Sequence, residues 1–409
     1  MNEEQELRAR FEAVDVPPSR LEVDALVRAG RRRVFRHRSF QGAGGVALAT
    51  AVLLAAPSIL TDAGGAQPAA GPADPSAATG PAAGPARPPA PTERAVPASA
   101  GGASRAPTRP GVSCPVTELP VPPGMTDVAV AAVDPTGRYV VGNSTVGQNF
   151  RPVLWTDGQP RALPVTAESI QATAVNPAGV VVGLVQDGPV EYVFRYEKGR
   201  YTRLRTPAGN WHVYPSPAIN EAGDIVINAE PSGNVGGKGS IVLLWRAGST
   251  AARKLPLPQG ANAFAVTDDG TIVGAMYRDG TAVAGYAWDQ RGKGRKLAAP
   301  AGEKAAAYAA RGGWATGGLW PSQTAARWDL RTGKVDQLKT AGPGDAVNAA
   351  GWVVAQGSLL SAGGTVGLDV PSGQQAVAVA VSDTGLVVGQ ARSDDGAGWQ
   401  NLGPRAWRC

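Results

Sequence analysis

A short segment recurs along roughly the last 280 residues of the chain, and this repeat constrains the fold more than any other feature. One copy, residues 172–183, reads Ala-Thr-Ala-Val-Asn-Pro-Ala-Gly-Val-Val-Val-Gly. Each copy has an apolar stretch, a four-residue turn that ends in glycine, and a second apolar stretch. The turn glycines, separated by 42, 44, 47, 43, 38 and 34 residues, are Gly137, Gly179, Gly223, Gly270, Gly313, Gly351 and Gly385. A period of about 40 residues with short strands predicts the blades of a β-propeller.

The residue types within one copy fit a sheet of four strands. Asn, Asp or Ser opens the turn because its side chain can bond the backbone two residues on, and glycine closes it where a positive φ is expected. β-Branched runs such as residues 180–182 suit a buried second strand. A third strand is predicted at the aromatic residue that follows most turns: Trp155, Phe194, Trp245, Trp288, Trp328 and Trp407. A fourth, at the outer edge where proline is tolerated, is predicted at residues 162–165, 254–257 and 296–297.

The two ends of the repeat region are complementary. The last copy stops at residues 406–409, after its third strand, whereas residues 119–121 (Leu-Pro-Val) supply a spare fourth strand before the first turn. Lending this strand to the last copy closes the ring and removes an open sheet edge. The sequence therefore predicts an all-β, seven-bladed propeller over 113–409, closed by an N-terminal outer strand. Six and eight blades stay open as alternatives, because the copies near Gly313 and Gly351 depart from the pattern.

The chain has only two cysteines, Cys114 and Cys409, and the proposed closure places them together. Cys114 would start the borrowed fourth strand and Cys409 would end the third, so a disulfide would replace the missing turn. The closed loop of nearly 300 residues corresponds to roughly 5 kcal/mol in the chain-entropy model. Such a bond requires an oxidising compartment. Two free thiols and an intermolecular bond are the alternatives.

Three segments precede the propeller. Residues 1–38 are charged, with a predicted helix whose capping box runs from Ser19 to Glu22, and they end in arginine clusters. Residues 39–61 carry no charge and match the roughly 20 residues of a membrane helix, with the basic residues on its cytoplasmic side. Residues 62–112, rich in Ala, Pro and Gly, predict a disordered linker. The sequence thus predicts a single-pass cell-membrane protein with an extracellular propeller; a cleaved signal peptide is the alternative.

The repeat resembles the HAF extracellular repeats of bacteria, with the pattern small-Ala-x-x-Asn-x-x-Gly-x-Val-Val-Gly before an aromatic strand. The resemblance is visible in residues 128–142, 172–183, 262–274 and 378–389, although the His-Ala-Phe tripeptide is absent. It implies a surface propeller without a settled activity. Residues 1–61 resemble the front of actinobacterial single-pass membrane proteins, some of which are anti-sigma factors. The zinc-binding His-x-x-x-Cys-x-x-Cys pattern of one anti-sigma class is missing here.

Few residues suggest chemistry. Of the two histidines only His212 lies in the propeller, in a blade-connecting loop expected to pack on a neighbouring blade, with a ligand platform as the alternative. No metal site or cofactor is expected. Turn carboxylates, which could meet on one face for Ca²⁺ or acid–base work, are Asp134, Asp268, Asp269 and Asp383. A basic hairpin, which could meet anionic wall polymer or phospholipid, contains Arg291, Lys293, Arg295 and Lys296. Local turn chemistry and solvation account for both groups without any function.

These observations predict a binding or interaction module for an extracellular protein, glycan or cell-wall component, with no catalytic residues and no enzymatic activity. The net charge of +6 stems partly from the segment beside the membrane, so no nucleic-acid partner is expected. One alternative is a transmembrane regulator of the anti-sigma type, in which residues 1–38 bind a cytoplasmic partner. Another is a propeller hydrolase or lyase that uses carboxylates. The ligand and its binding face are not specified by the sequence.

Overall fold

The computed structural model describes residues 113–409, apart from 233–238 and 395–398. These residues belong to one compact unit of the chain. The segments predicted as cytoplasmic helix, membrane helix and linker (1–38, 39–61 and 62–112) lie outside the described residues. The described ranges contain strands and turns, and no helix in them is long and apolar enough to cross a bilayer.

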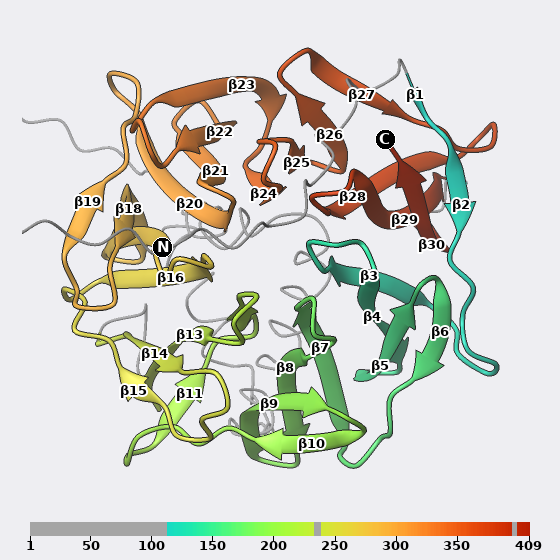
Figure 1. Ribbon diagram of the computed structural model, residues 1–409, viewed down its shortest axis with the longest axis horizontal. Helices are drawn as coiled ribbons and strands as arrows, with labels where there is room; N and C mark the ends of the chain where they lie inside the picture. Colours follow the sequence, from blue (N-terminus) through green and yellow to red (C-terminus); the bar gives the residue numbers. More distant parts are fainter. Residues whose placement is uncertain (1–112, 233–238, 395–398) are drawn as a thin grey trace, which may run out of the picture. The chain divides into compact units, whose positions relative to one another are not determined.

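Seven sheets follow one another around a ring, and each is one blade, which confirms the seven-bladed propeller (Figure 1). The strands of a blade are counted here from the central channel outward. Blade 1 contains β3 (Val128–Val133), β4 (Tyr139–Val146), β5 (Asn149–Thr156) and β6 (Gln159–Ala162). Blade 2 contains β7 (Ser169–Val175), β8 (Val181–Asp187), β9 (Val190–Glu197) and β10 (Arg200–Arg203). In blade 3, β11 (Trp211–Val213) and β12 (Ala218–Ile219) both pair with β13 (Ile225–Pro231), followed by β14 (Ile241–Trp245) and β15 (Arg253–Lys254).

The remaining four blades continue this order. Blade 4 contains β16 (Ala261–Val266), β17 (Ile272–Arg278), β18 (Thr281–Trp288) and β19 (Gly294–Lys296). Blade 5 contains β20 (Lys304–Arg311), β21 (Trp314–Trp320), β22 (Thr324–Asp329) and β23 (Val335–Ala341). Blade 6 contains β24 (Gly344–Val347), β25 (Val353–Ala355), β26 (Ser358–Ser361) and β27 (Gly364–Leu368), with β1 (Ser113–Cys114) added outside. Blade 7 contains β28 (Gln375–Val381), β29 (Leu386–Asp394), β30 (Trp399–Arg408) and the borrowed β2 (Val116–Glu118).

The ring closes as predicted, with one difference. β2 pairs antiparallel with β30, placing Val116 opposite Trp407, and so forms the fourth strand of the last blade. A disulfide joins Cys114 to Cys409, whose Cα atoms are 5.0 Å apart. Cys114 was expected to start that fourth strand, but it lies in β1, which pairs in parallel with β27 of blade 6, opposite Leu368. The segment 113–118 therefore joins blade 6 to blade 7 as well as closing the ring.

The hydrophobic core is divided among the junctions between blades. Each of the seven apolar clusters in the described residues combines side chains of two neighbouring blades. The cluster between blades 2 and 3, for example, contains Val182 and Leu204 from one blade and Trp245 from the other. Because stability resides between blades, every blade needs a partner on both sides, which is why closure matters.

The aromatic residues predicted for the third strands all lie there and are almost fully buried. The fourth strands were predicted slightly too late along the chain, because β6, β15 and β19 end just before the leucine of each segment. Leu163 shows the reason: its N–H still donates to Pro152 O (3.0 Å), while its side chain is buried in the core. The proline that follows thus lies beyond the ladder, where its missing donor is not needed.

Four of the buried tryptophans also fasten one blade to the next, a role that the sequence did not reveal. Each indole N–H donates to the backbone carbonyl that directly follows the leucine of the preceding blade. The bonds are Trp155 to Pro120 (2.6 Å), Trp245 to Arg205 (3.1 Å), Trp328 to Ala298 (2.6 Å) and Trp407 to Asp369 (2.7 Å). The indole nitrogen of Trp288 is buried without a hydrogen-bond partner in the described part of the chain.

Candidate functional site

The turns of the repeat join the first and second strands and lie at one end of the channel. Their seven glycines have φ between 72° and 93°, in the left-handed region, as the repeat predicts. Asn176 shows the role of the polar opening residue. Its Oδ1 accepts from the N–H of Ala178 (3.1 Å) and Val180 (3.0 Å), and its Nδ2 donates to Asn220 O in the next blade (3.3 Å). The turn-opening residue therefore shapes its own turn and links two blades.

The first strand of six blades contains a β-bulge at one shared position, three residues before the turn. Bulges bend a strand and re-aim the side chain of the extra residue. The residues at this bulge position are Ala131, Thr173, Phe264, Tyr308, Asp345 and Val379. Large or acidic side chains occupy it in blades 4, 5 and 6, and small ones in blades 1, 2 and 7, so the channel wall is uneven.

In five of the six bulged blades, the glycine that ends the Val-Val-Gly run leaves room for the bulged first strand; blade 6 has Ala355 at this place. A Cβ on Gly183 would lie 1.8 Å from the carbonyl oxygen of Gln171, because the bulged strand approaches the second strand closely there. Gly142, Gly274, Gly317 and Gly389 have the same close contact in their blades. Blade 3 has Ile227 at this place, and its first strand is interrupted between β11 and β12. This glycine of the repeat thus allows the first strand, which lines the channel, to bulge toward the second strand.

A cavity of about 220 Å³ occupies the turn end of the channel. Ala, Val and Ile residues at the ends of the first strands form most of its wall, and Phe264 and Tyr308 are its members furthest from the turns. Six residues lie at its mouth, five in the turns and Arg311 at the end of β20: Pro135, Pro177, Glu221, Asp268, Arg311 and Asp383. The site is therefore a small apolar chamber with a charged entrance.

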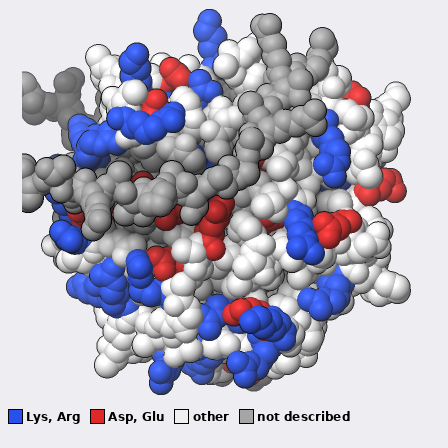
Figure 2. Space-filling model, in the orientation of Figure 1, with Lys and Arg blue, Asp and Glu red and all other residues white. Residues whose placement is uncertain are grey.

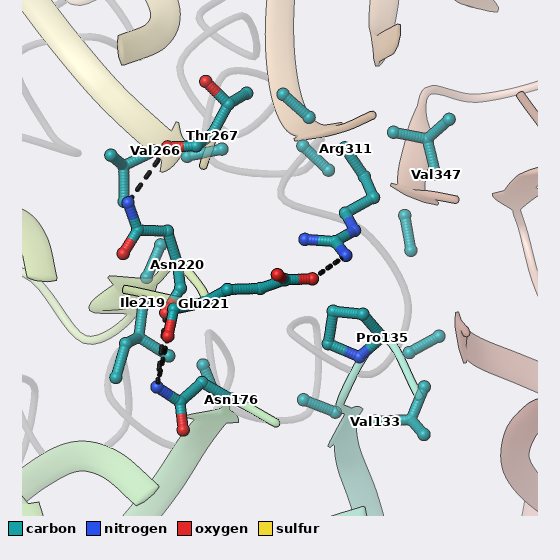
Figure 3. Close-up of a pocket in the computed structure, with 18 of the residues that line it drawn as sticks. Val133, Pro135, Asn176, Ile219, Asn220, Glu221, Val266, Thr267, Arg311 and Val347 are labelled. Atoms are coloured by element: carbon teal, nitrogen blue, oxygen red, sulfur yellow. Dashed lines mark hydrogen bonds and ion pairs between the residues drawn. The ribbon is translucent and has the colours of Figure 1, made fainter. Parts of the chain in front are cut away.

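Arg311 is the centre of that entrance, as Figure 3 shows for its approach to Glu221. Its guanidinium forms ion pairs with Glu221 of blade 3, Asp268 of blade 4 and Asp383 of blade 7, the last at 2.8 Å. Asp268 and Asp383 also each accept a backbone N–H from another turn. The Arg311 side chain is 19% exposed, and those of Glu221 and Asp268 are about twice as exposed. The guanidinium of Arg311 thus connects four blades across the mouth of the cavity. Because three carboxylates surround one guanidinium, the mouth has an excess of negative charge.

The position of Arg311 follows from a departure in its repeat copy. Arg311 stands where Asn176 stands in blade 2, three residues after the bulge. The turn of blade 5 is a tight hairpin through Gly312 (φ 57°) and Gly313 (φ 85°), a conformation that two glycines adopt without a side-chain cap. Because its own turn does not need it, the side chain of Arg311 can extend over the channel.

Electrostatics fix the protonation state of this group. Burial alone would lower the pKa of Arg311, but hydrogen bonds to Asp383 and Glu221 and the charges of Asp383 and Asp268 raise it above its ordinary value. Arg311 therefore remains charged at every relevant pH, and the entrance keeps its ion pairs at neutral pH.

The bulge residues Asp345, Tyr308 and Phe264, which lie further from the turns, form a second group with different electrostatics. Burial raises the pKa of Asp345 to about 7, and the N–H of Gln356 that it accepts only partly opposes this. Burial, the neighbouring Tyr277 and the charge of Asp345 raise the pKa of Tyr308, which is hydrogen-bonded to Tyr277. Phe264 packs edge-on against Tyr308, with ring centroids 5.3 Å apart. These bulge residues place a titratable carboxyl beside phenol and phenyl rings.

The structure separates the four carboxylates singled out from the sequence. Asp268 and Asp383 do meet on one face, around Arg311. Asp134 is fully buried and caps its own turn through the N–H groups of Thr136 and Tyr139. Asp269 accepts from Thr267 and from the N–H of Thr271, bonds that outweigh its burial and lower its pKa. No group of three or more metal-ligating side chains occurs among the described residues.

Sequence reasoning missed Arg311, Glu221 and Asp345. Glu221 has the same place in its turn as Asp268 and Asp383, and this shared second turn position was the available signal. His212 lies in β11, and its Nδ1 is 2.9 Å from an oxygen of Glu191 in blade 2. The expected packing of this segment on a neighbouring blade is correct, although it is a strand.

Comparisons with known proteins identify the fold. No family model matches the chain, and no curated protein matches it. An oligogalacturonate lyase from Vibrio parahaemolyticus is similar in structure, with a TM-score of 0.51 and 11% identity over 72% of this chain and 93% of that one. Puromycin hydrolase has a TM-score of 0.47 and 17% identity, over 69% and 54%. TolB from Acinetobacter baumannii has 0.36 and 14%, over 69% and 63%.

At these identities the likeness shows the fold alone, a seven-bladed β-propeller. The expectation that this chain is not an enzyme is nevertheless corrected, because this fold is shared with an enzyme, the oligogalacturonate lyase. That expectation depended on missing histidine and cysteine chemistry. Carboxyl and phenol groups can also transfer protons, and the channel holds both.

Proposed function

We propose that residues 113–409 form the extracellular ligand-binding head of a single-pass membrane protein. In this proposal residues 39–61 cross the membrane, 62–112 are the tether, and 1–38 remain available to a cytoplasmic partner. The resemblance of the repeat to HAF extracellular repeats supports the location. The disulfide between Cys114 and Cys409 supports it too, because such bonds persist in oxidising compartments.

The observation that carries the proposal is the chamber at the turn end of the channel, with apolar walls and a charged entrance. Its three carboxylates outnumber the single guanidinium of Arg311, so a ligand with a positive group is favoured there. A primary amine is the simplest such group. In an extracellular protein, glycan or wall component it would be a lysine side chain or an amino sugar.

The ligand class is tested by titrating the full chain with matched probes in a calorimeter. Glucosamine oligomers and a lysine-containing peptide are compared with their N-acetylated forms, which keep the shape and lose the charge. We expect binding of at least one free amine, and a roughly tenfold loss on acetylation and in the double variant Glu221→Gln/Asp268→Asn. Equal binding of acetylated and free probes, or no binding of either, would refute the proposal.

Location is tested separately. In intact cells a membrane-impermeant protease should remove a tag placed after Cys409 and leave a tag placed before Met1. The denatured, unreduced chain should show no free thiol. Cleavage of the tag before Met1 with the tag after Cys409 left intact, or two free thiols, would contradict the proposed topology, and a membrane-free product lacking its first 60 or so residues would show a cleaved signal peptide instead.

A carboxylate-based hydrolase or lyase is the second candidate function, and Asp345 is the observation that favours it. A group with a pKa near 7 is suited to accept and return a proton, and Tyr308 lies beside it. The test incubates the full chain with uronate-containing and neutral polysaccharides and measures new reducing ends and unsaturated products. Turnover that Asp345→Asn abolishes and Asp157→Asn retains would support catalysis. Absence of products, or equal turnover in both variants, would count against it.

A further inference from the structure

The rim of the propeller carries a concentration of positive charge on three successive blades. It comprises the fourth strands of blades 3, 4 and 5 and the turns leading into them. Ten basic and three acidic residues occur there: Arg246, Arg253, Lys254, Arg291, Lys293, Arg295, Lys296, Arg331, Lys334 and Lys339, with Asp289, Asp329 and Asp336. We call these ten residues the basic belt. Figure 2 shows Lys and Arg side chains along the edge where β15, β19 and β23 lie in Figure 1.

The acidic residues of this region do not neutralise the belt. Asp289 accepts the backbone N–H groups of Arg291 and Lys293, both at 2.9 Å, and so caps its own turn. Asp329 does the same for the N–H groups of its turn, and Asp336 forms an ion pair with Arg327, outside the belt. Within the described ranges eight exposed belt residues form no ion pair: Arg253, Lys254, Arg291, Lys293, Arg295, Lys296, Lys334 and Lys339.

Contacts between blades hold the belt in a fixed arrangement. Arg246 and Arg253 of blade 3 both donate to Oε1 of Gln290 in blade 4, each at 2.8 Å. Arg295 of blade 4 donates to Leu330 O in blade 5 at 2.6 Å. The three outer edges are thus linked in sequence, and binding a ligand across them requires little new ordering.

The remainder of the rim differs. The fourth strand of blade 6, β27, contains no charged residue, and β1 covers its edge. The borrowed strand β2 of blade 7 contributes Glu118 and no basic residue. Blade 1 has Arg161 with Asp157, and blade 2 has Lys198, Arg200 and Arg203 with Glu197, so basic residues continue onto blade 2 but are most numerous on blades 3 to 5. The channel mouth, in contrast, is negative.

We propose that the basic belt binds a linear anionic polysaccharide, one that carries phosphate or carboxylate groups along its chain. A flexible polymer can follow the outer edges of three blades, which face successive directions around the ring, and contact all of them. A flat membrane can meet only some of these edges at once. Because the belt and the channel mouth use different residues and opposite charges, this site is independent of the proposed amine site.

The test measures binding of the full chain to polygalacturonate and to a poly(glycerol phosphate) polymer, with neutral dextran as the uncharged comparison. The belt variant replaces Lys254, Arg291, Lys293 and Lys296 by Gln. The control variant replaces Arg161, Lys198, Arg200 and Arg408, which are also exposed but lie in other blades, by Gln. Both variants lose the same charge, so they separate a localised site from an effect of net charge.

We expect the belt variant to bind at least one polyanion roughly tenfold or more weakly, the control to change less than about twofold, and binding to weaken with added salt. Glu221→Gln/Asp268→Asn should leave polyanion binding intact, so failure here and failure of the amine site are distinguishable. Equal losses in belt and control variants would overturn the proposal. So would equal binding of dextran, or retention by phosphatidylglycerol vesicles that neither polymer displaces.

Discussion

Blades 2 and 5 perform the same structural task with different residues at the turn. In blade 2, Asn176 caps its own turn and donates to the next blade. In blade 5, Gly312 and Gly313 form the turn unaided, and Arg311 reaches carboxylates on three other blades. Blade 2, which follows the repeat, thus uses the polar side chain at this position within its own turn. Blade 5, which departs from the repeat, extends the side chain at this position over the channel.

The bulge position gives the same contrast between blades 2 and 6. Thr173 of blade 2 donates to nearby carbonyl oxygens, including Pro217 O at 3.1 Å, and is thereby part of the framework. Asp345 of blade 6 is half-buried and accepts the N–H of Gln356, and burial raises its pKa to about 7. Candidate functional groups therefore gather in the copies that depart from the repeat. The predictions below test whether these departures act on the channel while the framework stays regular.

The largest effect is expected from Asp345→Asn. The raised pKa means that Asp345 is protonated in both states below about pH 4, so it carries no penalty there. As pH rises from about 4 to 7 the unfolded chain ionises first, and the folded state loses up to about 4 kcal/mol. Asparagine cannot ionise, so the variant should be more stable by up to that amount at pH 8 and nearly unchanged at pH 4. Denaturant unfolding at pH 4, 6 and 8 measures this.

Asp157→Asn is the matched control for that experiment. Asp157 has an exposed carboxylate paired with Arg138 on the surface, and its replacement should change stability by less than about 1 kcal/mol at each pH. If wild type and Asp345→Asn showed the same pH profile, the unpaired carboxyl in blade 6 would have no energetic consequence.

Arg311→Gln should have the next largest effect. It leaves the carboxylates of Glu221, Asp268 and Asp383 close together without their shared cation, and we expect a loss of about 2–3 kcal/mol at pH 7. Arg138→Gln, at an exposed pair, should cost less than about 1 kcal/mol. Equal losses in Arg311→Gln and Arg138→Gln would show that the shared cation at the channel mouth contributes no more than a surface ion pair.

The architecture was accessible from the sequence because its determinants are local and repeated. Gly179 and its equivalents report a left-handed φ, and Trp155 and its equivalents report a buried third strand, in copy after copy. The spare strand before the first turn predicted the closure and the pairing of Cys114 with Cys409. The errors were local: the predicted fourth strands include residues such as Leu163 that lie beyond the end of the strand, and Cys114 lies in β1 beside blade 6 instead of in the borrowed strand.

The candidate site was accessible only in part, because it depends on the ring. Asp268 and Asp383 lie more than one hundred residues apart, and each alone is explained as a turn residue. Only closure of the propeller brings them to one guanidinium. Arg311 was overlooked because its copy fails to match the repeat, although that mismatch was itself the available signal. Asp345 could not be found without the bulge that sets its direction.

A smaller effect is expected from Asn176→Ala, which tests the regular framework. It leaves the N–H groups of Ala178 and Val180 without their acceptor and removes a link to the next blade, for a loss of about 2 kcal/mol. Asn348→Ala in blade 6 removes the equivalent contacts and should cost the same. Gln159→Ala, at an exposed site, should be near neutral. Unequal losses for the two asparagines, measured by thermal unfolding, would mean that blade 6 departs in its framework as well.

The smallest effect is a difference between tryptophans. Trp155 of blade 1 and Trp328 of blade 5 each donate an indole hydrogen bond of 2.6 Å to the preceding blade, whereas buried Trp288 has no such bond in the described residues. Tryptophan-to-phenylalanine removes the same atoms at all three sites. The loss at Trp155 and Trp328 should therefore exceed that at Trp288 by about 1 kcal/mol and be equal between them. Trp155 lies in a blade whose sequence follows the repeat, and Trp328 in one that departs from it. Equal losses at the two sites would show that the sheet of blade 5 is held like that of blade 1. The difference in blade 5 would then lie in its channel-facing turn.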